Sequence, residues 1–192
     1  MVFDGIIIAI VIALFRGGNF LNFADMKLKA RWIFPILLLI QIVVFLTQSK
    51  FEVIGAYSNY IFLLVYVIGL LFLYINRHHP GFTLIFIGVL LNFIVMAANG
   101  GRMPVSPEAA SILDPFFIEV LQNGLYGKHA LITESTRLAL LGDIIPLSAP
   151  YPKEQVISIG DVVMNIGVFL FIQNLMVKPK VKDVDTHAEA TI

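Results

Sequence analysis

The sequence contains no cysteine and little charge of either sign. None of its 192 residues is Cys, and only 14% are Asp, Glu, Lys or Arg. The lack of cysteine excludes disulfide bonds, thiol catalysis and Cys-based zinc or iron–sulfur sites. Thirteen basic and thirteen acidic residues give a formal net charge of zero. The strong positive charge typical of a nucleic-acid-binding protein is therefore missing as well.

Apolar residues fill most of the chain and are gathered in long blocks. Hydrophobic residues make up 58% of the sequence and its mean hydropathy is +0.88, whereas a soluble domain is about half apolar and a quarter charged. Continuous apolar blocks predict membrane-spanning helices. Five such blocks are present, at residues 2–15, 32–47, 57–75, 82–98 and 162–175. We therefore predict an all-α fold, a polytopic membrane helix bundle of about five spans.

The first block resembles the core of a signal peptide in length. Asp4, however, stands where a signal peptide carries positive charge, and no small-residue cleavage site follows the block. We therefore interpret residues 2–15 as a retained span, although roughly 20 apolar residues are needed to cross a bilayer core.

The basic residues are unevenly distributed between the two sides that five spans define. With the N-terminus outside, eight of the thirteen fall on the cytoplasmic side: Arg16, Lys27, Lys29, Arg31, Arg77, Lys178, Lys180 and Lys182. Cytoplasmic loops of membrane proteins carry such an excess. We predict a multi-pass cell-membrane protein with the lipid bilayer as its partner. Residues 1–176 would form one bundle, and residues 177–192 a disordered cytoplasmic tail.

A polar loop, residues 99–161, would then face the exterior. Apolar residues from Ile112 to Leu125 recur at helical spacing, and Asp114 and Pro115 suit the start of a helix. This pattern predicts an amphipathic interfacial helix over residues 114–123. A second helical piece is expected at Thr133–Leu141, and three prolines (Pro146, Pro150 and Pro152) predict an extended return to the last span.

Two aspartates near the end of this loop are the main catalytic candidates. Asp143 and Asp161 each follow a glycine and each lies where the polar loop meets an apolar segment. Two carboxyl groups brought together at low dielectric share a proton and activate water without a metal or cofactor. Alternatively, Asp161 is the N-cap of the last span and Asp143 caps a short turn. Metal binding by these two residues with His129 is a third interpretation.

Other polar residues of the loop are candidates for binding a substrate. Arg102 lies in the run Asn99-Gly-Gly-Arg-Met-Pro, where its planar guanidinium would clamp a phosphate or carboxylate. The alternative for Arg102 is anchoring at the membrane interface. His129 and Arg137 lie on the same loop. The predicted substrate-binding residues are Asn99, Arg102, His129 and Arg137.

One stretch of the loop reads Asp143-Ile-Ile-Pro-Leu, and a later one, Ser-Ile-Gly-Asp161, stands at the start of an apolar block. Together they resemble the C-terminal part of lipoprotein signal peptidases (signal peptidase II). The resemblance implies that Asp143 and Asp161 form a catalytic pair at the outer membrane face, acting on a membrane-anchored peptide or lipoprotein. Ser158 stands where that family has an asparagine. The whole pattern, with Asn99-Gly-Gly-Arg-Met-Pro and two Gly-Asp pairs, also resembles a family of small bacterial membrane proteins without an assigned activity, which implies a bacterial inner membrane.

A non-catalytic role is the alternative to a hydrolase. In that interpretation the predicted interfacial helix docks a membrane protein partner through Phe116 and Phe117, and both aspartates are caps. A transporter fits less well, because charged groups are lacking inside the predicted spans.

Overall fold

Five long helices form the body of the molecule in the computed structural model, which describes residues 2–48, 50–122, 128–151 and 153–177. They are α1 (Val2–Phe15), α2 (Ile33–Thr47), α3 (Glu52–Ile75), α4 (Phe82–Ala98) and α7 (Ile159–Met176), and they fall on the five apolar blocks of the sequence. The α3 and α7 helices are long and apolar enough to cross a membrane, while α1, α2 and α4 are shorter apolar helices.

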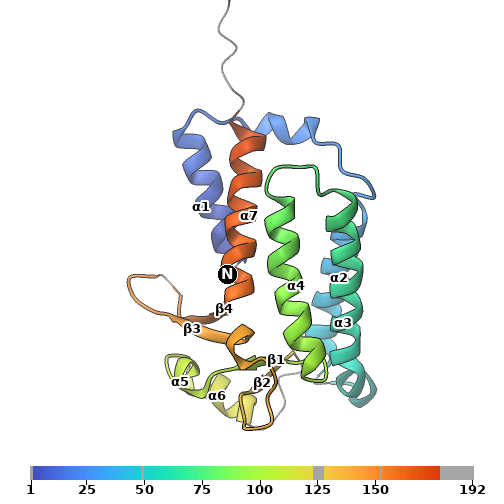
Figure 1. Cartoon of the computed structure of the whole chain (residues 1–192), viewed down its shortest axis with the longest axis vertical. Helices are drawn as coiled ribbons and strands as arrows, with labels where there is room; N and C mark the ends of the chain where they lie inside the picture. Colours follow the sequence, from blue (N-terminus) through green and yellow to red (C-terminus); the bar gives the residue numbers. More distant parts are fainter. Residues whose placement is uncertain (1, 49, 123–127, 152, 178–192) are drawn as a thin grey trace, which may run out of the picture.

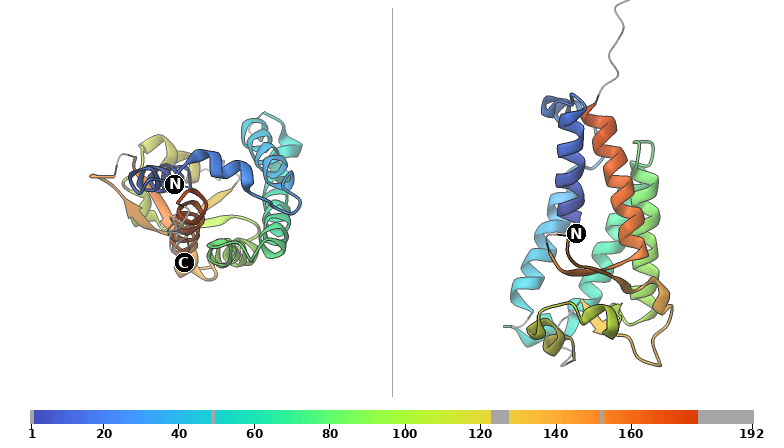
Figure 2. Two further views of the ribbon diagram at one scale, coloured as in Figure 1. Left: turned by 90° about the horizontal axis from the view of Figure 1, so that it is seen from above. Right: turned by 90° about the vertical axis from the view of Figure 1, so that its left-hand side faces the viewer.

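The five helices pack side by side in an order that differs from their order in the chain. The contacts run α1–α7–α4–α3–α2, and the helices form the curved row seen in Figure 2. The last helix is therefore inserted between the first and the fourth. This arrangement places α7 against both α1 and α4, so residues at its start can meet groups from distant parts of the sequence.

Glycines bring α4 and α7 into close contact. A Cβ atom at Gly88 would collide with backbone atoms of Gly160 and Met164, and one at Gly167 would collide with the backbone of Gly81 and Ile85. The pairs Gly88/Gly160 and Gly81/Gly167 therefore lie two turns apart along antiparallel helices. Small residues at such contacts are typical of helix packing in membranes, where close backbone approach replaces hydrophobic burial.

The ends of the helices opposite the sheet are tied together by buried amides. Asn76, which is fully buried at the end of α3, accepts a hydrogen bond from Lys29 N and donates one to Lys29 O. Gln173 in α7 donates to Ala9 O in α1 and accepts from the Arg16 guanidinium. These contacts fix the segment that carries the short 3-10 helix η1 (Phe20–Asp25) across this end of the bundle (Figure 1).

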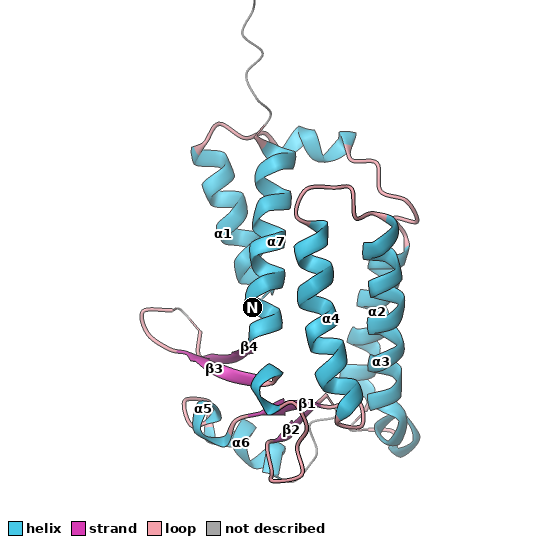
Figure 3. Ribbon diagram, in the orientation of Figure 1, coloured by secondary structure: helices cyan, strands magenta, loops and turns pink. Residues whose placement is uncertain are grey.

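A small mixed sheet and two short helices lie at the other end, as Figure 3 shows. The strands are β1 (Met103–Val105), β2 (His129–Leu131), β3 (Asp143–Leu147) and β4 (Gln155–Ser158), and the helices are α5 (Pro107–Ala110) and α6 (Pro115–Gln122). The strand order is β2-β1-β3-β4, with β1 parallel to β2 and β3 and β3 antiparallel to β4. The sheet joins the bundle at buried Met103, which packs with Val95 and Met96 of α4.

The helix expected over residues 114–123 is confirmed as α6. Its Leu121 is buried in a small core with Val105 and Ala110, so α6 packs on the sheet layer. The side chains of Phe116 and Phe117 lie outside the described part of the structure, as does nearly all of the predicted tail, so the docking role of those two residues stays a prediction.

Two predictions about the loop are wrong. The fold is not all-α, because residues 103–158 contribute a four-stranded sheet. Nor is Thr133–Leu141 a helix: it is a turn that becomes a 3-10 helix only at Ala139–Leu141. The Thr136 hydroxyl accepts a hydrogen bond from Thr133 N, and such local side-chain bonds compete with helix formation. The extended return predicted from the three prolines is confirmed in part: β3 contains Pro146 and β4 leads into α7, but the chain reverses between these two antiparallel strands, and Pro152 lies outside the described residues.

Candidate functional site

Asp161 sits in the first turn of α7 and both of its carboxylate oxygens are bonded. One oxygen accepts a hydrogen bond of 3.1 Å from Ser158 N, while Ser158 Oγ accepts one of 2.9 Å from Asp161 N. This reciprocal pair is a capping box, with Ser158 as the N-cap. The prediction that Asp161 is itself the N-cap is wrong by three positions, although the residue does serve the helix start.

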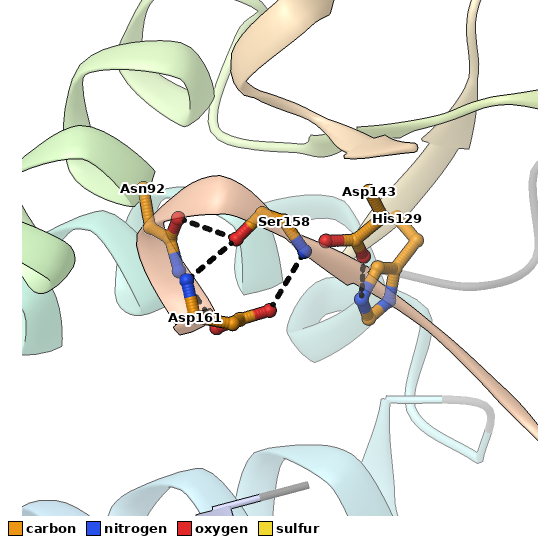
Figure 4. A network of polar contacts seen from close by, with 5 residues as sticks. All are labelled: Asn92, His129, Asp143, Ser158 and Asp161. Carbon is orange, nitrogen blue, oxygen red and sulfur yellow. Dashed lines mark hydrogen bonds and ion pairs between the residues drawn. The ribbon is translucent and has the colours of Figure 1, made fainter. Parts of the chain in front are cut away.

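Asn92 connects this cap to α4. Its amide nitrogen donates to the second oxygen of Asp161 at 2.9 Å, and its amide oxygen accepts from Ser158 Oγ at 2.9 Å. Asn92 and Ser158 are 3% and 0% exposed. Figure 4 shows the closed network that Asn92, Ser158 and Asp161 form. Because every polar group in it has a partner, the orientation of the Asp161 carboxylate is fixed.

Asp143 opens β3 and is held from both sides. It pairs with Val105 on the parallel strand β1 and with Ser158 on the antiparallel strand β4. Its carbonyl oxygen accepts a hydrogen bond from Ser106 N at 2.9 Å. Asp143 is thus a strand residue rather than the cap of a turn, and the sheet places it across from the residue that caps α7.

The carboxyl group of Asp143 is buried and strongly perturbed. The residue is 6% exposed, and its Oδ1 atom has no hydrogen-bond partner among the described residues. Burial above all, and then the negative charge of Asp161, raise the pKa of Asp143 to about 8 against the opposing effect of Lys128. At neutral pH Asp143 is therefore mostly a carboxylic acid, which can donate a proton as well as accept one.

His129 contacts the other oxygen of Asp143. Its Nε2 atom lies 3.6 Å from Oδ2 of Asp143, a separation too long for a hydrogen bond. Burial and the neighbouring charge of Lys128 lower the pKa of His129 to about 3. The imidazole and the carboxyl group therefore meet as neutral partners at pH 7, and their contact is not an ion pair.

Lys128 supplies the positive charge beside these groups. Its ammonium lies 5.7 Å from the ring centroid of Tyr66 in α3. The interaction with Tyr66 raises the pKa of Lys128 against the opposing effect of burial, and the charges of Asp143 and Asp161 raise it further. One cation thus accompanies one neutral and one charged carboxyl group where the sheet meets the bundle.

The four predicted substrate-binding residues lie in different surroundings. Asn99 donates its amide hydrogens to Val95 O and Arg137 O and accepts from Arg137 N, so its side chain holds the loop to the end of α4. Arg102 is partly buried just after Gly100 and Gly101, which turn the chain with φ values of 66° and 87°. The Arg137 side chain is exposed. Of the four residues, Arg102 and Arg137 therefore provide positive charge, whereas His129 lies against Asp143.

Metal binding gains no support from the described residues. They contain no group of three His, Cys, Asp or Glu side chains arranged to hold an ion. What the site contains instead is a pair of carboxyl groups in contrasting environments, with a cation and a neutral imidazole beside them.

Three residues of the site were not predicted. Asn92 could have been noticed, because it is an amide in the interior of an apolar block. Ser158 was visible as the residue three before Asp161, the spacing of a capping box. Lys128 gave no signal, because only the parallel pairing of β1 with β2 brings it to the site.

Two comparisons with known proteins give matches. A family model described as "Family of unknown function (DUF5317)" matches residues 25–173. A protein of Thermotoga maritima, described as "Uncharacterized protein", is 31% identical over 180 residues, which are 94% of this chain and 93% of that relative. No solved structure matches the chain. These matches agree with the resemblance to a family without an assigned activity, and they do not bear on the resemblance to lipoprotein signal peptidases.

Proposed function

The chain belongs to DUF5317, a family of unknown function, and we propose that it is a membrane hydrolase acting on a membrane-anchored peptide or lipoprotein at the outer face. The contrast between two carboxyl groups carries this proposal. Asp143 is buried and holds a proton at neutral pH, while Asp161 carries a charge that helps to keep the proton there. Carboxyl groups in such different states divide the acid and base roles in hydrolytic sites.

The two carboxyl groups can carry out the proton transfers that amide hydrolysis requires, one as base and the other as acid. Asp161 takes a proton from a water molecule as the water oxygen bonds to the carbonyl carbon, and Asp143 donates its proton to the carbonyl oxygen. Collapse of the tetrahedral intermediate breaks the carbon–nitrogen bond. In that step the proton on Asp161 passes to the leaving nitrogen and Asp143 recovers its own from the oxygen. Arg102 and Arg137 are the candidates for holding the substrate chain, with Asn99 and His129 as positioning residues.

The membrane placement is part of the same proposal. The five helices would cross a bacterial inner membrane, with the N-terminus outside and the C-terminus cytoplasmic. Large apolar side chains point outward from the bundle; Phe34 and Leu39 of α2, for example, are 61% and 60% exposed. Lipid is the favourable surrounding for such a surface. Residues 26–32, which carry three basic side chains, and the sheet lie at opposite ends of the helices (Figure 1), in keeping with a cytoplasmic and an outer face.

Reconstituted protein tests the proposal. The probe is a diacylated peptide with a fluorophore and a quencher on either side of its amide bonds, offered in proteoliposomes. We expect cleavage by the wild type and none by Asp143→Asn or Asp161→Asn. Glu154→Gln is the matched control, because it makes the same chemical change at an exposed position. Ser158→Ala controls for the helix cap, since it weakens the cap while keeping both carboxyl groups.

A second probe measures binding rather than cleavage. A peptide with a secondary alcohol in place of the amide imitates the tetrahedral intermediate, and transition-state analogues bind far more tightly than substrates. We expect it to raise the melting temperature of the wild type and of Glu154→Gln, and not that of Asp143→Asn. Equal effects of both probes on the wild type, Glu154→Gln and Asp143→Asn would exclude the dyad and favour a non-catalytic membrane subunit.

A further inference from the structure

A basic segment, residues 26–32, runs from η1 to α2 at the end of the bundle opposite the sheet (Figure 1). Lys27, Lys29 and Arg31 occupy alternate positions in it and all three are exposed. Leu28 points the other way and packs against the core around Phe72. One face of the segment is therefore anchored in the protein, and the other presents three cations.

The backbone of this segment is held in place. The Asn76 side chain accepts a hydrogen bond of 2.8 Å from Lys29 N and donates one of 3.0 Å to Lys29 O. Ala30 adopts a left-handed conformation with φ of 52°, and its carbonyl accepts from Ile33 N as α2 begins. The positions of the charges are thus set before any ligand arrives, which lowers the ordering cost of binding.

The three cations have no acidic partner among the residues that the structure describes. Within the described parts of the chain, none of them forms an ion pair, and the sequence has no Asp or Glu between residues 26 and 51. Lys27, Arg31 and Trp32 line a hollow of about 380 Å³. The Arg31 guanidinium lies 5.6 Å from the Trp32 ring centroid. Positive charge, a concave surface and an exposed indole therefore coincide.

We propose that residues 26–32 bind the phosphodiester headgroup of an anionic phospholipid in the cytoplasmic leaflet. A guanidinium presents paired donors to phosphate oxygens, and lysines add point charges. Tryptophan favours the level of the headgroups, so Trp32 places the hollow where a phosphate lies. The cytoplasmic position of the segment rests on the membrane orientation proposed above, whereas headgroup binding rests on the geometry of residues 26–32.

Trp32 makes the site directly observable, because it is the only tryptophan in the sequence. Full-length protein in a neutral detergent is titrated with short-chain phosphatidylglycerol, with the matching phosphatidylcholine and with inorganic phosphate, and Trp32 emission is recorded. We expect a saturable change with phosphatidylglycerol alone. Raising the salt concentration should weaken this binding, because exposed charges are screened.

Lys27→Gln and Arg31→Gln should each weaken phosphatidylglycerol binding about fivefold, from the typical contribution of one basic residue near an anionic surface. Lys153→Gln, at an exposed position in the sheet layer, is the control and should bind like the wild type. Equal responses to both lipids, an equal response to inorganic phosphate, or unchanged affinity in both Gln variants would overturn the proposal. Carbonate extraction of cell membranes keeps the two proposals apart: release of the protein rejects the membrane placement, whereas retention without selective binding rejects only the lipid site.

Discussion

Asn92 in α4 donates a hydrogen bond of 2.9 Å to a carboxylate oxygen of Asp161 in α7. This bond crosses the interface where Gly88 and Gly160 bring the two helices together. It also joins α4 to the cap of α7, whose N-cap Ser158 stands opposite Asp143 in the sheet. The packing of the bundle and the placement of the two aspartates therefore depend on the same few residues.

Replacing Asn92 with alanine should destabilise the protein. The change removes the amide donor to an Asp161 oxygen and the acceptor of the buried Ser158 hydroxyl hydrogen, and an unsatisfied buried polar group costs about 1–3 kcal/mol. Thermal unfolding in detergent measures the loss. A double-mutant cycle with Asp161→Ala should show coupling between the two sites, and strictly additive effects would mean that the bond contributes nothing.

The glycine contacts lead to a matched pair of substitutions. Gly88→Ala places a methyl group against the backbone of α7 and should destabilise the bundle by about 1–3 kcal/mol, the usual cost of overpacking. Gly69→Ala in α3 meets only Leu37 Cδ1 at 3.9 Å, and should be neutral or stabilise by up to about 1 kcal/mol. Melting temperatures compare the two, and a tolerated Gly88→Ala would contradict the close packing of α4 on α7.

Asp143 should make the stability of the protein fall as the pH rises from about 4 to about 8. Its pKa is raised from 3.8 to about 8 on folding, so the folded state holds a proton that the unfolded state releases above pH 3.8. This contribution is complete below pH 3.8 and is lost as the pH rises to 8. Asp143→Asn should flatten a plot of melting temperature against pH between about pH 4 and pH 8, and Glu154→Gln should leave the plot unchanged in that interval.

His129 should act in the opposite direction. Its pKa falls from 6.5 to about 3 on folding, so its contribution is complete above pH 6.5 and is lost as the pH falls to 3. His129→Gln should therefore make the protein less sensitive to acid. An acid arm that is as steep in this variant as in the wild type would show that the imidazole is not buried as a neutral group.

The helical part of the fold could be predicted from the sequence, and the sheet could not. Apolar blocks gave the position of all five long helices, because each block is continuous and is bounded by polar turns. The strands β1 and β2 have three residues each, too few for an alternating pattern, and they pair across a loop of more than twenty residues. Only non-local contacts determine such a pairing.

The candidate site was predicted only in part, because it also depends on contacts between distant parts of the sequence. Asp143 and Asp161 stood out because each follows a glycine beside an apolar segment. The different environments of their carboxyl groups could not be predicted from the neighbouring residues. They depend on the burial of Asp143 by the sheet and on the hydrogen bonds that Asp161 accepts from Asn92 and Ser158. The amide of Asn99, expected to bind substrate, is bonded to the backbone at residues 95 and 137.

A catalytic acid with a pKa of about 8, as Asp143 has, should determine how turnover depends on pH. If Asp143 must donate a proton, turnover of the diacylated peptide should fall as the pH rises through about 8. The positive charge of Lys128 lowers the pKa of Asp143, so Lys128→Met should raise that pKa and move the fall in turnover to higher pH. Lys153→Met is the control, and its profile should coincide with that of the wild type.

Infrared difference titration of the carboxyl groups tests the protonation of Asp143 most directly. The carbonyl band of a protonated carboxylic acid is distinct from the bands of a carboxylate, and the band that Asp143→Asn removes belongs to this residue. We expect that band to be present at pH 7 and to disappear with a midpoint at about pH 8. A midpoint near the ordinary value of 3.8 would mean that Asp143 is a carboxylate at neutral pH, and the acid–base pair would be excluded.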